Sequence, residues 1–208
     1  MKKTVRNTLL GVGLLAGSLN AFADEGSSSD SKIFLNVNLG ANILADSDFG
    51  GGSDNAQWNT GTRVDISFGY FVAPNLSVGA ETGWTWNELD NTGSTSVDLY
   101  QIPILATVVY HIPLQDEHWK PYVGAGVGGV SSMLVIDTPG NDDTGNAFAF
   151  AYQLKVGIAY AINQDWLVDF GYKFMGVAEH DWDTDEFGDI QGGALYNHSL
   201  QASFTFNF

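Results

Sequence analysis

The sequence contains no cysteine among its 208 residues, so no disulfide stabilises this fold. Lys and Arg are also scarce, at 8 against 24 Asp and Glu, which gives a formal net charge of −16. Nucleic acids and other anionic surfaces repel such a chain, whereas divalent cations and cationic molecules are attracted to it. The composition therefore predicts no nucleic-acid partner.

Beyond residue 23 the sequence has no run of roughly 20 consecutive apolar residues, the length that a membrane helix needs. The first 23 residues carry Lys2, Lys3 and Arg6, then a short apolar stretch, then the small-x-small site Ala21-Phe22-Ala23. These three parts predict a cleavable signal peptide at 1–23. We expect a disordered tail at 24–31 and one domain at 32–208, which would cross a membrane only as strands.

Apolar residues alternate with small or polar ones along most of the remaining chain. This period of two predicts strands. The eight predicted strands are 32–43, 63–72, 76–87, 100–110, 121–135, 148–160, 166–175 and 195–208. The long polar connections are 44–60, 88–96, 137–146 and 179–194, and short ones alternate with them. Alternating long and short links predict an all-β fold, an eight-stranded antiparallel up-and-down transmembrane barrel.

Three stretches carry a family resemblance. They are YQIPILATVVYHI at 100–112, WKPYVGAGVGG at 119–129 and FTFNF at 204–208. On these the chain resembles the small bacterial outer-membrane barrels of the OmpA-transmembrane-domain-like, OmpX-like and opacity types. The resemblance implies the outer membrane as location, with lipid and lipopolysaccharide as surroundings. It also implies that Phe208, with Phe204 and Phe206, is the signal that the barrel-assembly machinery recognises.

Along the predicted strands, the alternate positions that should face the barrel interior carry a set of polar and charged side chains. An eight-stranded barrel has an interior just wide enough for side chains to fill. We therefore expect a mutually paired core network, since an unpaired buried charge is costly. A narrow ion-conducting pore is the alternative. The network residues are Arg63, Asp65, Glu81, Gln101, Gln153, Lys155, Asp169, Lys173 and Gln201.

Pro103 lies within the strand predicted at 100–110. Proline has no backbone N–H and normally marks an edge strand, which a closed barrel lacks. Pro103 therefore counts against closure unless a bulge is present there.

The connection 179–194 spaces Asp181, Asp183 and Asp185 like the start of a calcium loop. The pattern then fails, because Glu186 and Gly192 stand where glycine and a bidentate glutamate are required. The sequence thus predicts at most a weakly bound divalent cation and otherwise no cofactor. The alternative is a solvated acidic loop.

The same loops contain aromatic and acidic residues that we expect to be exposed, as in contact surfaces. The predicted function is non-enzymatic, with an envelope role and surface interaction through acidic loops. The extracellular partner is unknown. The predicted contact residues are Trp58, Asp142, Asp143, Trp182, Asp183, Asp185 and Phe187.

A lipid-modifying enzyme is a further alternative. It would need a nucleophile and a base within hydrogen-bond reach. His198 and Ser199 are adjacent and must face opposite sides of a strand, and His111 and Thr107 have no acid beside them in the sequence. These pairs do not favour catalysis.

Overall fold

The computed structural model describes residues 33–45, 47–48, 55–89, 95–116, 118–183 and 190–208. The predicted signal peptide at 1–23 and tail at 24–31 lie outside these residues. In the described residues no helix is long and apolar enough to cross a membrane.

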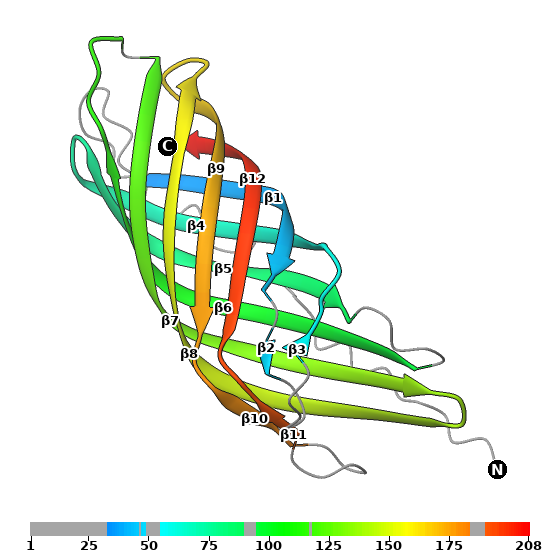
Figure 1. The fold of residues 1–208 in the computed structure, drawn as a ribbon. Helices are drawn as coiled ribbons and strands as arrows, with labels where there is room; N and C mark the ends of the chain where they lie inside the picture. The colour runs from blue at the N-terminus through cyan, green and yellow to red at the C-terminus, as the bar shows by residue number, and fades with distance from the viewer. Residues whose placement is uncertain (1–32, 46, 49–54, 90–94, 117, 184–189) are drawn as a thin grey trace. The chain divides into compact units, whose positions relative to one another are not determined.

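Eight long antiparallel strands form a closed barrel in the order β1-β12-β9-β8-β7-β6-β5-β4 (Figure 1). The barrel strands are β1 Ile33–Leu44, β4 Gly61–Ala73, β5 Leu76–Glu88, β6 Ser96–His111, β7 Trp119–Thr138, β8 Asn141–Ala161, β9 Trp166–Val177 and β12 Leu195–Asn207. The predicted fold class is confirmed.

β1 closes the barrel. It pairs with β12 from Phe34 to Leu44 and with β4 from Ile33 to Asn42. The first and last strands are therefore neighbours, and the eight-stranded sheet has no free edge along the barrel wall.

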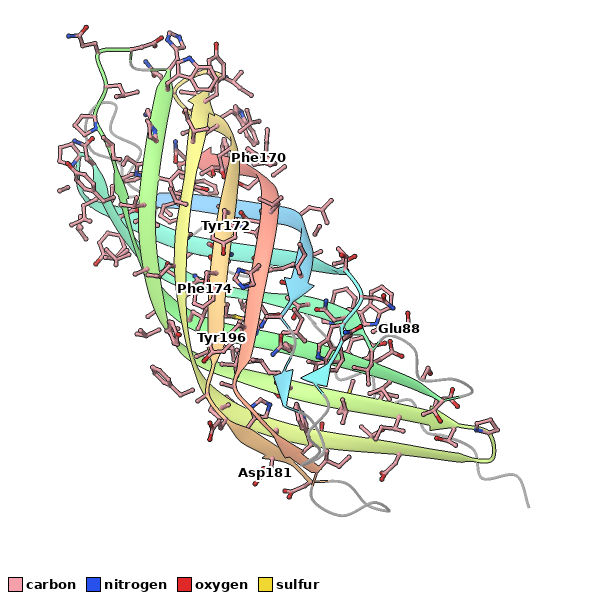
Figure 2. The ribbon with its side chains drawn as sticks, viewed as in Figure 1. Glu88, Phe170, Tyr172, Phe174, Asp181 and Tyr196 are labelled. Atoms are coloured by element: carbon pink, nitrogen blue, oxygen red, sulfur yellow. The ribbon has the colours of Figure 1, made fainter. Side chains whose placement is uncertain are left out.

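The side chains alternate across this wall as the sequence predicts. On β8, Phe150 and Leu154 are 59% and 55% exposed, whereas Ala151 and Gln153 between them are 0% and 1% exposed. The exposed apolar face is the surface that lipid would cover. Figure 2 shows Phe170, Tyr172, Phe174 and Tyr196 along β9 and β12.

Pro103 does not interrupt closure, and no bulge is present there. The register from Thr82↔Ile104 continues unshifted to Thr85↔Gln101, and only the pairs between them are missing. The Pro103 carbonyl accepts a hydrogen bond from Thr82 Oγ1 at 2.8 Å. A side-chain hydroxyl thus bonds the proline carbonyl beside the gap in the ladder.

The predicted loop at 137–146 is wrong. β7 runs to Thr138 and β8 begins at Asn141, so a tight turn joins two long strands. Gly140 has a φ of 95°, a conformation that only glycine adopts readily. The polar composition reflects solvation of a hairpin that projects beyond the neighbouring strands (Figure 1).

Two small two-stranded ribbons lie in the connection between β1 and β4 and in the connection between β9 and β12. β2 (Ser47–Asp48) pairs with β3 (Asn55–Ala56), and β10 (His180–Trp182) pairs with β11 (Ile190–Gly192). Short links between strands lie at the opposite end. By the usual orientation of such barrels, the short links face the periplasm and the ribbons face outward.

The outer part of the barrel interior holds an apolar cluster beside a buried polar one, in which Asn42 hydrogen-bonds Asn87 and Asn197. The side chains of the apolar cluster are fully or nearly fully buried, and Trp58 packs against them. The cluster consists of Leu44, Val97, Leu99, Leu105, Val130, Leu134, Ala149, Ala151, Met175, Val177, Trp182 and Leu195.

Candidate functional site

A charge network lies inside the barrel beneath the apolar cluster. Asp65 accepts hydrogen bonds from Arg63 Nε at 2.8 Å, Lys173 Nζ at 2.7 Å and Gln201 Nε2 at 2.9 Å. Arg63 and Asp65 are separated by two positions on β4, so both point inward. This geometry pairs the buried Asp65 carboxylate with two cations.

Glu81, from β5, is the second anion of the network. Its carboxylate lies 2.7 Å from Lys173 Nζ, 3.4 Å from Lys155 Nζ and 3.9 Å from Arg63 Nη2. Ser67 Oγ donates a further hydrogen bond at 3.1 Å. The paired charges come from strands on different sides of the closed sheet, so the network connects opposite walls.

The network contains more positive than negative charge. Among the residues that the structure describes, the ion pairs of Arg63, Lys155 and Lys173 are with the carboxylates of Asp65 and Glu81. Lys173 is 2% exposed and bonds both carboxylates at 2.7 Å, whereas Lys155 is 15% exposed and bonds one at 3.4 Å. Lys155 is therefore the least neutralised cation of the three.

Asp169 lies apart from these ion pairs. Its two oxygens accept hydrogen bonds from Tyr122 OH at 2.8 Å and from Ser203 Oγ. The Tyr122 hydroxyl reaches it over the paired Gly157 and Gly171, where an added Cβ would collide with that hydroxyl. Two hydroxyl donors thus satisfy the Asp169 carboxylate.

The structure places the remaining glutamines of the predicted set away from the ion pairs. Gln101 is 1% exposed, and its Oε1 accepts a hydrogen bond from Thr85 Oγ1 at 3.4 Å. The side-chain amide of Gln153 has no hydrogen-bond partner among the described residues. Of the nine predicted network residues, six are joined by direct contacts: Arg63, Asp65, Glu81, Lys155, Lys173 and Gln201.

Below the network the barrel holds a cavity of about 380 Å³ at the end that carries the short links. Its floor includes Lys155 and Lys173. Pro74, Asn75 and Pro113 from two short links line its mouth. The sequence did not predict this cavity, because inward parity identifies which residues face the interior but not the space left between them.

Two predicted contact residues are not exposed. Trp182 is 0% exposed and belongs to the buried apolar cluster. The β10–β11 ribbon turns this side chain inward because burying an indole is favourable. Asp143 is 5% exposed, because it lies on the same face of β8 as the inward-facing Ala151 and Gln153.

The other predicted contact residues differ in their exposure. Trp58 is half-buried and bridges to Leu89, and Asp183 is exposed. Asp142 is the second residue of β8, and its side chain is outside the described part. Asp185 and Phe187 lie outside the described residues. The interaction role of this surface stays a prediction.

The predicted divalent-cation ligands are only partly described. Asp181 and Asp183 are exposed on either side of the buried Trp182, and Asp185 lies outside the described residues. Among the residues the structure describes, no group of three or more His, Cys, Asp or Glu is placed to hold a metal ion. The weak cation site stays a prediction.

His198 and Ser199 point to opposite sides of β12. His198 Nδ1 lies 2.6 Å from Tyr172 OH on the outer wall, whereas Ser199 Oγ donates to Asn42 Oδ1 at 2.7 Å inside the barrel. The two side chains therefore cannot act on one substrate atom.

Asp116 lies outside the membrane-spanning strands and has a lowered pKa. It lies in the short link between β6 and β7, where the His118 backbone N–H donates to Asp116 Oδ1 at 2.9 Å and His118 Nδ1 lies 3.1 Å away. These hydrogen bonds favour the ionised carboxylate and hold the pKa of Asp116 below its usual value of 3.8.

With this geometry in place, comparison with known proteins identifies the family. Residues 9–208 match the family described as the outer membrane protein beta-barrel domain. The chain belongs to this family. It is an outer-membrane protein, and the predicted family and location are confirmed.

Individual outer-membrane barrels are also similar to this chain. The outer-membrane protein y4mB of Sinorhizobium fredii is 27% identical over 152 residues, covering 70% of this chain and 65% of its own length. Outer membrane protein W of Salmonella typhimurium is 25% identical over 141 residues, covering 58% of this chain and 65% of its own length. The matched part thus spans less than two thirds of each relative.

The fold is shared with Neisserial surface protein A. That structure has a TM-score of 0.59 and 19% sequence identity, and the match covers 85% of this chain and 97% of the other. At this identity the likeness shows the fold alone.

Proposed function

We propose that this chain is a non-enzymatic outer-membrane barrel that is closed to ions, has a structural role in the envelope and interacts with other surfaces through its acidic outer loops. The observation that carries the closed state is the interior: an apolar cluster lies above a network in which Lys173 bridges Asp65 and Glu81. An ion crossing the barrel would have to displace both layers.

The charge distribution supports the surface role. Among the described residues, Arg63, Lys155 and Lys173 line the interior and Lys120 lies at the mouth on the short-link side. At the outer end the exposed ionisable side chains are acidic: Glu88, Asp137, Glu179, Asp181 and Asp183. Such a surface favours cationic partners and disfavours anionic ones.

The surroundings follow from the family. The exposed apolar belt suits outer-membrane lipid and lipopolysaccharide. The barrel-assembly machinery is the proposed partner of the signal formed by Phe204, Phe206 and Phe208. For Phe208 the main-chain N–H donates to the Ile33 carbonyl at 2.8 Å, so the signal lies beside the closing strand β1.

Planar-bilayer recording tests the closed state. We expect the purified protein to insert without a steady conductance above that of the lipid. Lys155→Gln should remain equally silent, since the apolar cluster above is unchanged. A stable channel in the wild type whose ion selectivity shifts in Lys155→Gln would contradict the proposal and favour the narrow pore.

A gene deletion tests the envelope role. Cells without the protein should become more sensitive to detergent, and the wild-type gene should restore resistance. Unchanged sensitivity in the deletion strain would contradict a structural role.

For the surface role, shortening the connections 44–60 and 179–194 should abolish adhesion to cationic surfaces. Full adhesion by that variant would contradict the loop hypothesis.

A further inference from the structure

The cavity on the short-link side is lined by both charged and aromatic side chains. Its volume of about 380 Å³ falls within the range of small-molecule sites. The charged residues that line it are Asp116, Lys120, Lys155, Asp169 and Lys173. Which of these charges are already engaged within the protein decides what the cavity can bind.

Three of the five are engaged. Lys173 bonds Asp65 and Glu81, the Asp169 oxygens accept hydrogen bonds from Tyr122 and Ser203, and Asp116 is held by His118 at the mouth. Both carboxylates that line the cavity therefore have donors of their own.

Lys155 has unused donor capacity. An ammonium group has three N–H donors, and Lys155 Nζ makes one long contact, at 3.4 Å to Glu81. The ion pairs leave Lys155 with the weakest share of the two paired carboxylates, and the third interior carboxylate, Asp169, is held by hydroxyl donors. The floor of the cavity thus presents a partly exposed cation.

A chain of aromatic rings lines the cavity from β1 across to β7. Phe34 and Phe71 have ring centroids 5.8 Å apart, Phe71 and His111 5.7 Å, and His111 and Tyr122 6.0 Å. All four line the cavity. His111 Nδ1 is buried and has no hydrogen-bond partner among the described residues, so a polar atom remains within this apolar wall.

We propose that the cavity binds a small organic anion with a planar apolar part, entering from the periplasmic side, with its acidic group on Lys155 and its planar part against Phe34, Phe71 and Tyr122. This goes beyond the proposed envelope role. It gives the barrel a solute-binding site on the side away from the acidic loops, and it requires no passage through the closed interior.

A matched pair of probes tests the charge requirement. Titrations of 4-fluorobenzoate and of neutral 4-fluorobenzamide against the full folded chain in detergent micelles, followed by ¹⁹F NMR, should show saturable binding of the carboxylate only. Empty micelles correct for partitioning. Equal binding of both probes, or no saturable binding of 4-fluorobenzoate, would overturn the proposal.

Two substitutions at one position test the residue. Lys155→Gln should weaken 4-fluorobenzoate binding by about tenfold or more, because a charge-assisted hydrogen bond is lost. It keeps Arg63 and Lys173 on the two paired carboxylates. Lys155→Arg should keep most of the affinity. Heat-modifiable gel mobility checks that each variant is folded, and unchanged affinity in folded Lys155→Gln would refute the site.

A third variant tests the aromatic wall. Phe71→Leu should weaken 4-fluorobenzoate binding, and acetate should displace the probe poorly from the wild type. Displacement by acetate at equal concentration would show that the planar part contributes nothing, and the proposal would fail.

Discussion

Glu81 shows most clearly how a single residue holds the interior together. Its carboxylate lies within 4 Å of all three cations of the network, from Arg63, Lys155 and Lys173. Glu81→Gln would keep the side-chain shape and leave these cations with Asp65 alone. We expect a loss of ~3–5 kcal/mol in the free energy of unfolding, measured by urea titration in detergent, because the remaining buried charges become uncompensated.

Glu88 provides the control, since it ends the same strand β5 and is exposed. Figure 2 marks it at the outer end of the barrel. Glu88→Gln should change the unfolding free energy by no more than ~0.5 kcal/mol. Equal effects of the two substitutions would mean that the network contributes nothing beyond general charge.

Asp116 gives a prediction on pH. Its pKa is lowered first by the His118 backbone N–H and then by the His118 ring. A lowered folded-state pKa adds stability above the unfolded pKa, which is lost as the pH falls through the folded value. In His118→Ala the backbone donor remains, so the carboxyl pKa should rise yet stay below 3.8, as followed by ¹³C NMR. Titration at the ordinary aspartate value would assign the whole shift to the ring.

At the residue scale, the sequence predicted correctly which of these side chains face inward, because successive residues of a strand point to opposite faces. Arg63, Asp65 and Glu81 face inward as alternation requires. Parity could not tell that Asp169 binds hydroxyls rather than a lysine, because that depends on where Tyr122 reaches over the glycine pair.

At the scale of elements, the β10–β11 ribbon contributes one side chain to the barrel interior. Trp182 is fully buried and belongs to the apolar cluster. Trp182→Ala would remove that bulk and leave a cavity that the barrel wall cannot collapse to fill. We expect a loss of ~3–5 kcal/mol in the free energy of unfolding, measured by urea titration.

Asp181, the preceding residue of the same ribbon, is exposed and serves as the comparison. Asp181→Ala should leave the unfolding midpoint nearly unchanged. If the two variants were equally stable, the ribbon would not be part of the folded core.

The elements themselves were predictable because lipid-facing positions repeat every second residue. The hairpin turn at Gly140 was missed, since the Asp, Asn and Gly that solvate a projecting ribbon also compose loops. The apolar cluster had a detectable signal. On β6, Leu99 and Leu105 are apolar at inward positions, and a strand that is apolar on both faces indicates burial on both sides.

For the whole molecule, assembly in the cell should depend on Phe208 more than folding does. Its ring packs edge-on against Phe206, with centroids 4.7 Å apart, and is 48% exposed. Phe208→Ala should lower the folded fraction in the outer membrane while refolding into detergent micelles stays near the wild-type yield. Heat-modifiable gel mobility measures both, and a parallel loss in micelles would reassign Phe208 from a recognition signal to packing.

The contacts of Lys173 with Asp65 and Glu81 join residues 108 and 92 positions apart along the chain. Contacts between such distant segments carry a large loop-closure cost, and we expect them to form late, after β1 has joined the first and last strands. We therefore expect these ion pairs to stabilise the barrel after its strands have paired. If these ion pairs form after the transition state, weakening them should speed unfolding and leave the rate of folding nearly unaltered.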